Sequence, residues 1–309
     1  MVVVVTGGVG YIGSRLIREI PDHPRFSGET VRILDNFRQP RYHSLWNLPS
    51  YADYEFVEGD IRNEKVVETA LEDADTVFHL AAVTNAPETF DIPEKTWEVN
   101  HKAAVDLFDA SKEAGVENFV NAVTCSVYGR TEEKITEGFD CDPESPYGEA
   151  KLAAEQEMFE RHDGSIELTG LRLGTVYGWT RGMRFDTVVD KFSLLAATGQ
   201  PLTVYEGAED QKRPYLHVQD AVRSMLFAAE QLGDGEAYNV VGQNARLQDV
   251  IDAIEHHFPN VEIGYTEAEQ LNQLSYIVND KKIRSEGFET AYTLDQGVEE
   301  LADKFRAFV

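Results

Sequence analysis

Cysteines and long apolar runs are scarce in this sequence. Only 2 cysteines, Cys125 and Cys141, occur in 309 residues, which is too few for a disulfide framework. The apolar run at residues 1–5 is far shorter than the roughly 18 residues that a membrane span requires, and it lacks the basic flank of a signal peptide. We therefore expect a soluble, cytoplasmic protein.

Basic residues are also scarce, because 28 Lys and Arg stand against 55 Asp and Glu, a formal net charge of −27. Such a surface repels phosphate backbones and anionic lipid, so we expect neither a nucleic acid nor a membrane as a partner. The acidic residues are spread along the chain instead of forming a tail. This spread suits solubility at high salt, where repulsion is screened. A halophilic source and an ordinary acidic protein both remain open.

Hydrophobic residues make up 42% of the chain and charged residues 27%, which excludes a disordered or fibrous protein. Segments typical of strands alternate with segments typical of helices. Strands are expected at residues 2–5, 31–34, 54–57, 76–80, 118–123, 168–173 and 238–241, and helices at residues 11–20, 66–71, 96–114, 147–161 and 220–232. The alternation predicts an α/β fold with a doubly wound parallel sheet.

The alternation loosens after Gly174, where turn residues separate short segments. No internal repeat and no linker rich in Pro, Gly or Ser divides the chain. We therefore expect a first domain made of residues 1–174 plus about 210–242. Residues from about 175 to 209 plus 243–309 are expected to form a smaller lobe that grows out of it.

A glycine-rich loop, residues 6–13, follows the first expected strand and opens the first expected helix. Gly7, Gly10 and Gly13 allow the backbone to turn tightly and to approach a pyrophosphate, which the helix N-terminus attracts. Asp35 ends the next strand, where a carboxylate meets the adenosine ribose of a dinucleotide. These features predict a dinucleotide-binding Rossmann domain, with a plain strand–helix turn as the alternative.

The same acidic residue predicts which dinucleotide binds. Asp35 would repel the 2′-phosphate of NADP, so NAD is the expected cofactor. Arg38 and Arg41 follow it closely in the sequence. They are either ordinary loop charges or residues that soften the preference for NAD.

Tyr147 and Lys151 stand four residues apart at the start of an expected helix, which places both side chains on one face. A free Tyr titrates near ~10, but a neighbouring ammonium and a positively charged nicotinamide favour its phenolate. Thr124 follows the fifth strand, and ligands of a doubly wound sheet bind beyond strand ends. We predict that Thr124 and Tyr147 share a substrate hydroxyl. The alternatives are a strand-end cap for Thr124 and a surface position for Tyr147.

Several motifs occur in the order found in one known family. They are the glycine-rich loop, Asp60-Ile61-Arg62, His79-Leu80-Ala81-Ala82, Asn100, Thr124 with Tyr128-Gly129, residues 147–151 and residues 213–220. On these motifs the sequence resembles the extended short-chain dehydrogenases/reductases. Within them it is most similar to the NAD-dependent epimerase/dehydratase group that includes UDP-galactose 4-epimerase. The resemblance runs from Val2 to about Val241 and continues more loosely to the end.

The resemblance implies two sets of contacts and no metal site. The cofactor, NAD, is expected to contact Gly7, Gly10, Tyr11, Ile12, Gly13, Asp35, Asn36, Asp60, Ile61, Leu80, Ala81, Ala82, Asn100, Tyr147 and Lys151. The substrate, a nucleoside-diphosphate sugar, is expected to contact Thr84, Thr124, Thr175, Arg181, Arg184 and Arg213. His79, His217 and Asp220 are expected to be structural.

Arg213 is expected at the diphosphate of the sugar nucleotide, for which a guanidinium fork is suited, with a surface ion pair as the alternative. At two places this sequence lacks a residue that many 4-epimerases use to bind the nucleotide sugar. Many 4-epimerases have an Asn in the segment that here is residues 173–175, and an Arg where this chain has residues 270–275. Arg181 and Arg184 are expected to supply the missing charge.

A third departure concerns the reaction. The dehydratases of the family carry Asp-Glu directly after the catalytic Thr, and its decarboxylases carry Glu at the second of these places. This chain has Cys125 and Ser126 there, neither of which is a good proton donor to a hydroxyl. The expected function is therefore an NAD-dependent epimerase, acting at C4 of a nucleoside-diphosphate sugar of the UDP-glucose/UDP-galactose type through a transient 4-keto sugar.

Two alternative functions remain. One is an NAD-dependent sugar or sugar-nucleotide dehydrogenase or reductase of the same family, which would release its ketone. The other is a non-catalytic NAD-binding regulator, which the presence of Thr124, Tyr147 and Lys151 disfavours. The expected helices at residues 96–114 and 147–161 carry apolar residues on more than one face, and with the resemblance this predicts a homodimer through these helices.

Overall fold

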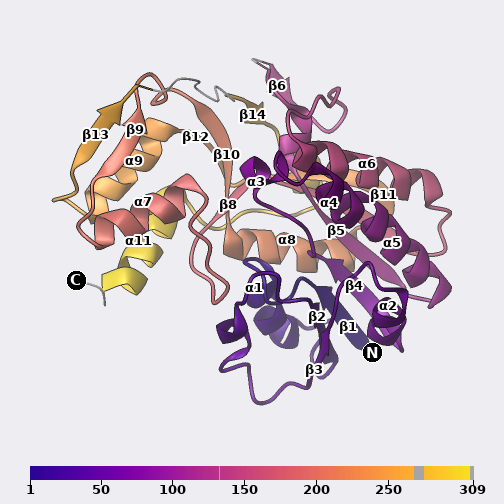
Figure 1. Ribbon diagram of the computed structural model, residues 1–309. Coiled ribbons are helices and arrows are strands. Elements are labelled where there is room, and N and C mark those ends of the chain that lie inside the picture. The colour runs from indigo at the N-terminus through magenta and orange to yellow at the C-terminus, as the bar shows by residue number, and fades with distance from the viewer. Residues whose placement is uncertain (132, 268–274, 307–309) are drawn as a thin grey trace.

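A parallel sheet forms the centre of the larger domain (Figure 1). The computed structural model describes residues 1–131, 133–267 and 275–306, and within them this sheet has seven strands in the order β11-β7-β5-β4-β1-β2-β3. The strands are β1 (Val2–Thr6), β2 (Thr30–Asp35), β3 (Tyr54–Glu58), β4 (Ala74–His79), β5 (Asn118–Thr124), β7 (Glu167–Leu173) and β11 (Asp234–Val240). All neighbouring pairs are parallel, which confirms the predicted doubly wound α/β fold.

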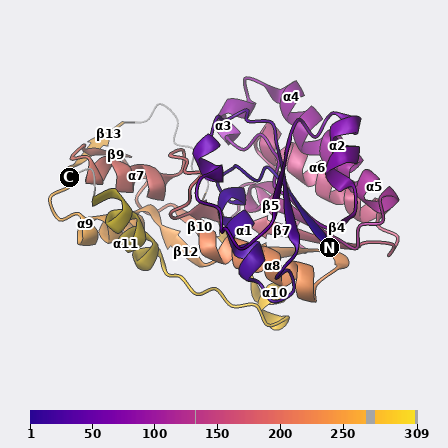
Figure 2. The same cartoon turned by 90° about the horizontal axis from the view of Figure 1, so that it is seen from below.

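Helices cover both faces of the sheet (Figure 2). Alternate residues of β1 show why: Val3 and Val5 pack with the helices on one face, whereas Val4 packs with those on the other. The first face is covered by α1 (Gly13–Glu19) and α8 (Val218–Gln231), and the second by α2 (Glu64–Leu71), α5 (Ala103–Glu113) and α6 (Pro146–Arg161). A strand buried on both faces must be apolar throughout, as the β-branched run at its start predicts.

The helix predicted at residues 96–114 has a more complex structure. It begins earlier, at α4 (Pro93–Trp97), because Pro93 is well suited to the first helical turn. A π-helical segment (Glu98–Lys102) then leads into α5. This segment holds Asn100, whose side chain bonds both to Val83 N (2.8 Å) and to Val83 O (2.9 Å). A π turn of this kind inserts an extra residue and often lies beside a functional site.

The smaller lobe contains elements that the sequence pattern did not predict. Outside the central sheet the strands are β8 (Thr175–Tyr177), β9 (Leu202–Tyr205), β10 (Lys212–His217), β12 (Gln243–Arg246) and β13 (Ile263–Thr266), and the helices include α7 (Val188–Ala197), α9 (Leu247–His257) and α11 (Leu294–Phe305). β10 lies within residues 210–242, which were expected in the first domain, and it pairs with strands on either side of that range. β10 pairs with β8 and β12, and β9 pairs with β13. These strands have three to six residues, too short for a clear period of two.

The remaining short elements connect these parts: α3 (Ala86–Thr89), β6 (Lys134–Ile135), β14 (Ile277–Val278) and α10 (Lys281–Ser285). β14 pairs with β6, which brings residues after the second undescribed segment back against the larger domain. Among the helices that the structure describes, each is too short or too polar to cross a bilayer.

Candidate active site

A cavity of about 560 Å³ opens at the carboxyl ends of the central strands, at the side that faces the smaller lobe. Residues that end or follow β1, β2, β3, β4, β5 and β7 line it. Ligands of open α/β sheets bind at this edge, where the strand order reverses between β1 and β4. The volume lies within the usual range for small-molecule sites.

The glycine-rich loop forms one wall of this cavity. Gly7 has φ +70°, and a Cβ there would lie 2.7 Å from Ala81 N. A Cβ on Gly10 would lie 2.9 Å from Gly7 O, and one on Gly13 would overlap the same oxygen. The loop therefore requires glycine at all three positions, and it keeps open the space that a pyrophosphate would occupy in front of α1.

Asp35 lies at the carboxyl end of β2 and lines the cavity. Its Oδ1 accepts a hydrogen bond from Phe37 N (2.9 Å) and its Oδ2 from Val9 N (3.2 Å). Burial raises the pKa of this carboxyl, while the backbone hydrogen bonds and Arg41 lower it. Arg38 also lines the cavity, but its guanidinium is paired with Glu88.

Asp60 is the second carboxylate at this end of the cavity. The Asn36 amide donates to its Oδ2 at 2.9 Å, and Arg62 bonds to both of its oxygens at 2.9 Å. The pKa of Asp60 is lowered to about 2, chiefly by Arg62. Asp60 is therefore fixed in position and ionised, next to where an adenosine would lie beyond Asp35.

Most of the residues predicted to bind the cofactor or the substrate are brought together here. Beyond those already described, the cavity is lined by Tyr11, Ile12, Ile61, Leu80, Ala81, Ala82, Thr84, Thr175 and Arg184. Tyr11 has a second role that the sequence did not indicate. Its hydroxyl lies 2.7 Å from Gly178 O and 2.9 Å from Asp190 Oδ2, so it also ties the glycine-rich loop to the smaller lobe.

Three predicted contact residues lie outside the lining of the cavity. Asn100 is fully buried and holds Val83, which lines the cavity, so Asn100 acts on the site through Val83. Arg181 is exposed to solvent. Arg213 leaves β10 with its guanidinium 5.6 Å from the centre of the Tyr276 ring, and that ring lines the cavity. The Arg that many 4-epimerases carry was sought at residues 270–275, of which 270–274 lie outside the described residues.

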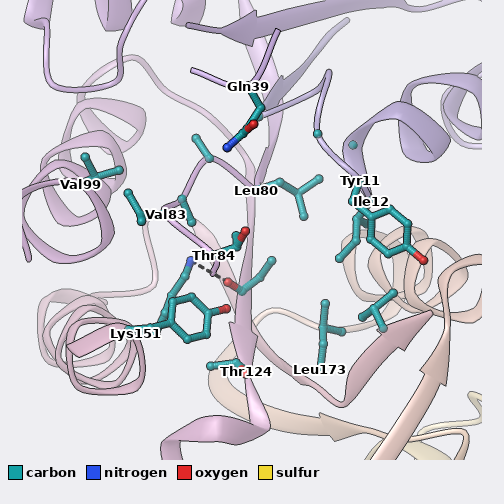
Figure 3. Close-up of a pocket in the computed structure, with 18 of the residues that line it drawn as sticks. Tyr11, Ile12, Gln39, Leu80, Val83, Thr84, Val99, Thr124, Lys151 and Leu173 are labelled. Atoms are coloured by element: carbon teal, nitrogen blue, oxygen red, sulfur yellow. Dashed lines mark hydrogen bonds between the residues drawn. The ribbon is translucent and has the colours of Figure 1, made fainter. Parts of the chain in front are cut away.

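The predicted catalytic residues Thr124, Tyr147 and Lys151 all line the cavity, and Figure 3 labels Thr124 and Lys151 there. Ser145 caps α6 by accepting a hydrogen bond from Gly148 N (3.2 Å), and the first turn then carries Tyr147 and Lys151 towards the end of β5. Lys151 is 3% exposed, and its Nζ donates to Ala122 O at 2.9 Å. Burial lowers the pKa of Lys151 to about 8.

Burial raises the pKa of Tyr147, while the charge of Arg184 and the hydroxyl of Thr124 lower it. Thr124 also accepts a hydrogen bond from Ser126 N (3.1 Å), so it caps the strand end and lines the cavity as well. The net effect is a raised pKa, so Tyr147 is a neutral phenol here, and Arg184 and Thr124 offset only part of the effect of burial. Such an arrangement is suited to moving a proton to and from a hydroxyl.

Tyr276 is one of several lining residues that were not predicted from the sequence, and it lies farthest along the chain. It is 6% exposed and interacts with Ser126 and Arg213, and burial raises its pKa to about 12. It precedes β14 and reaches a site whose other residues lie more than ninety positions earlier in the chain. No local pattern signals such a contact, because it depends on how β14 returns to β6.

Carboxylates are confined to one end of the cavity. Among the described lining residues, the only carboxylates are Asp35 and Asp60, both at the expected adenosine end. The Cys125 thiol next to Thr124 is buried and donates to Arg172 O at 3.2 Å, and its pKa is raised by burial. The described lining residues therefore include no carboxylate at the Tyr147 end of the cavity.

The histidines and the aspartate that were expected to be structural make such contacts. His79 is buried at the end of β4, with its Nδ1 2.8 Å from Thr6 Oγ1. His217 Nε2 lies 3.0 Å from Glu300 on α11. Asp220 accepts hydrogen bonds from Ala291 N (2.9 Å) and Tyr292 N (3.0 Å). The His79 contact joins β4 to β1, and the contacts of His217 and Asp220 join the C-terminal segment to β10 and α8.

Comparison with known proteins gives consistent results. The model of the NAD-dependent epimerase/dehydratase family matches residues 3–241. The low-salt glycan biosynthesis protein Agl12 of Haloferax volcanii is 27% identical, over 99% of this chain and 98% of Agl12. The dTDP-D-glucose 4,6-dehydratase of Mus musculus is 27% identical, over 98% of this chain and 88% of the mouse protein. The UDP-glucose 4-epimerase of Thermus thermophilus, solved with NAD, superposes with a TM-score of 0.86 at 26% identity over the whole of both chains.

Proposed function

The chain belongs to the NAD-dependent epimerase/dehydratase family, and we propose that within it this protein is a C4 epimerase of a nucleoside-diphosphate sugar. NAD is the cofactor of the family, and the glycine cradle with Asp35 and Asp60 fits it. The choice of reaction rests on one observation, the absence of a carboxylate beside Tyr147 among the described lining residues. Eliminating water from a sugar needs a group that protonates the leaving hydroxyl, and Cys125 and Ser126 are poor donors for that step.

The residues of the chain perform the proton transfers. Tyr147, as phenolate, removes the proton of the sugar hydroxyl and later returns it. The Lys151 ammonium stabilises the phenolate, and Thr124 orients the hydroxyl. The glycine-rich loop with Asp35 and Asp60 would hold NAD, which would supply reversible hydride transfer at the sugar carbon. Inversion at C4 follows when the keto sugar presents its other face before the hydride returns.

The binding of the nucleotide is assigned to the basic residues around the cavity. Arg184 lines it directly, and Arg213 approaches it behind the Tyr276 ring. A guanidinium is suited to a diphosphate because it offers paired N–H donors. Arg181 is exposed and has the weakest claim to this role.

The test is incubation of the protein with UDP-glucose, UDP-N-acetylglucosamine and dTDP-glucose, without added cofactor, followed by NMR and mass spectrometry. An epimerase gives the C4 isomer of one of them, with unchanged mass and no net NADH. A dehydratase would give a product lighter by one water molecule, the reaction named for the mouse relative. A parallel incubation with added NAD tests for a dehydrogenase, which would give a ketone and NADH. Either result would contradict the proposed epimerase.

Asp35→Ser is expected to narrow the preference for NAD over NADP by about tenfold or more, because removing a carboxylate removes its repulsion of a 2′-phosphate. The measurement is the ratio of the two dissociation constants in wild type and variant. Glu58→Gln is the control, since it removes a charge at the end of β3 without lining the cavity. If the wild-type protein binds both cofactors equally well, the role given to Asp35 is wrong.

The homodimer is part of this proposal, although the structure weakens one of its arguments. Val105, Leu107, Phe108 and Met158, which suggested an apolar surplus, are buried in the protein's own core. Trp97, at the end of α4, is 38% exposed, and in the proposed dimer it contacts the second subunit.

We expect a dimeric mass in light scattering and a shift to monomer for Trp97→Asp, because a charge is unfavourable in an apolar interface. Trp46→Asp, an equally drastic change at a side chain that is 64% exposed beyond η2 (Tyr42–Leu45), is the control. A monomeric wild type at both near-physiological and molar salt would refute the dimer.

The acidic surface leads to a salt prediction. With a net charge of −27, the melting temperature should rise between low salt and about 2 M KCl as carboxylate repulsion is screened. Substrate affinity should fall over the same range if arginines hold the diphosphate. Thermal melts and binding titrations separate the two effects. A melting temperature that stays constant or falls would remove the halophilic interpretation and leave the enzymatic one unaffected.

A further inference from the structure

Two histidines and one aspartate of the smaller lobe converge where α9 meets α11. His256 and His257 are the last residues of α9, and Asp295 lies in the first turn of α11. His256 Nδ1 is 3.0 Å and His257 Nε2 is 3.1 Å from the same oxygen, Asp295 Oδ1. None of the three lines the cavity described above. The proposed epimerase reaction does not use them.

The packing of the two helices brings together the backbone segments that carry these side chains. Apolar residues of α9 and α11, among them Ile251, Ile254 and Leu301, belong to one buried cluster. Thr293 caps α11 together with Gln296, which sets the direction of the first turn and therefore of Asp295. The packing of α9 on α11 and the cap of α11 therefore place His256, His257 and Asp295 next to one another.

His256 Nδ1, His257 Nε2 and Asp295 Oδ1 are atoms of the kinds that bind a metal ion, and they lie close together. Imidazole nitrogens and a carboxylate oxygen are the ligands that Zn²⁺ and similar ions take, at about 2.0–2.2 Å. With bonds of that length and tetrahedral angles, ligand atoms lie about 3.3–3.6 Å apart. The nitrogen–oxygen distances of 3.0 and 3.1 Å are those of hydrogen bonds, so an ion requires these atoms to separate by a few tenths of an ångström, and all three atoms lie within 4.8 Å of one another.

The electrostatic surroundings also favour a cation. Asp295 brings a carboxylate oxygen into contact with one nitrogen of each imidazole. The histidines lie at the C-terminus of α9, where the helix dipole is negative. Within the described residues this is the one group of His, Cys, Asp or Glu with such spacing.

We propose that His256, His257 and Asp295 bind a divalent transition-metal ion of the zinc class. The ion replaces the two hydrogen bonds to Asp295: each histidine binds as neutral imidazole through the nitrogen that now faces Asp295 Oδ1, with its remaining proton on the other ring nitrogen. Asp295 is the third ligand, and water completes the coordination. The site joins the end of α9 to the start of α11. Its role is therefore to stabilise the smaller lobe, and α11 in turn contacts β10 through Glu300 and His217.

The test uses the full chain, free of any histidine tag and stripped of metal with EDTA, titrated with ZnCl₂ in a calorimeter. We expect one equivalent to bind with a dissociation constant below about 100 µM, and zinc to raise the melting temperature. His256→Gln and Asp295→Asn should each weaken binding about tenfold or more, because each removes a ligand. Both changes are conservative and lie at exposed side chains.

His43→Gln is the matched control, because His43 is exposed and lies outside the group. A Cu²⁺-loaded sample gives a second readout: its electron paramagnetic resonance spectrum should show coupling to two imidazole nitrogens in the wild type and to one in His256→Gln. The proposal is overturned if no equivalent binds below about 100 µM, or if both ligand variants bind zinc as tightly as the control. These readouts do not depend on turnover, so they stand apart from the test of the epimerase.

Discussion

Tyr147→Phe is expected to lower kcat by about 10²–10⁴-fold, since this is the usual contribution of a positioned acid–base group. The variant loses only the oxygen that exchanges a proton with the sugar hydroxyl. The ring that packs at the start of α6 is retained, so the fold and NAD binding should be unchanged. A loss confined to kcat, with little change in KM, would show that the oxygen acts in the transition state.

The measurement is a steady-state comparison on whichever sugar nucleotide the wild type converts, with NAD binding followed separately. Tyr205→Phe provides the control, because it makes the same chemical change at a side chain that is 54% exposed on β9. If Tyr147→Phe keeps more than about a tenth of the wild-type rate, Tyr147 is not the base.

Lys151→Met is expected to abolish turnover and yet to increase the stability of the cofactor-free protein at pH 7. Lys151 is 3% exposed, and its burial lowers its pKa from 10.5 to about 8. A difference of that size corresponds to about 3 kcal/mol of destabilisation by the buried ammonium. Losing the hydrogen bond to Ala122 O offsets about 1 kcal/mol, which leaves a net gain of about 2 kcal/mol.

The destabilisation by the Lys151 ammonium depends on pH. Because the folded protein binds the Lys151 proton less tightly than the unfolded chain, the destabilisation is fully present below the folded pKa of about 8. It decreases as the pH rises towards the ordinary pKa of lysine, about 10.4, and is absent above it. The stability difference between variant and wild type should therefore shrink between pH 7 and about pH 10.

Urea denaturation of both proteins at the two pH values measures this effect. Lys191→Met on α7 is the control, since its side chain is exposed and should give no gain. A Lys151→Met protein that is less stable than the wild type at pH 7 would contradict a costly buried ammonium. One that retains turnover would contradict the role of Lys151 beside Tyr147.

Both substitutions concern side chains whose charged form is disfavoured by burial in the site. Lys151 is destabilising where it lies, and Tyr147 is held where burial opposes the phenolate that the reaction needs. Groups with shifted pKa values of this kind are typical of active sites. The local cost is offset by the large apolar clusters on both faces of the sheet.

The sequence by itself determined the features that depend on neighbours along the chain. The run at Val2 to Val5 shows a strand buried on both faces, and the loop at Gly7 to Gly13 shows a turn that only glycine permits. Tyr147 and Lys151 share a helix face because they are four residues apart. Local sterics and helical geometry fix all of these, so a single sequence reveals them.

The tertiary structure alone decided the contacts between distant segments. Tyr276 enters the cavity, Arg213 stands behind its ring, and Asn100 turns inward to hold Val83. His256 meets Asp295 only because α9 packs on α11. Such contacts depend on how the two lobes and their short strands pack, and packing is set by the shapes of many side chains at once. The periodicity of residues along the chain does not predict how many distant side chains pack together.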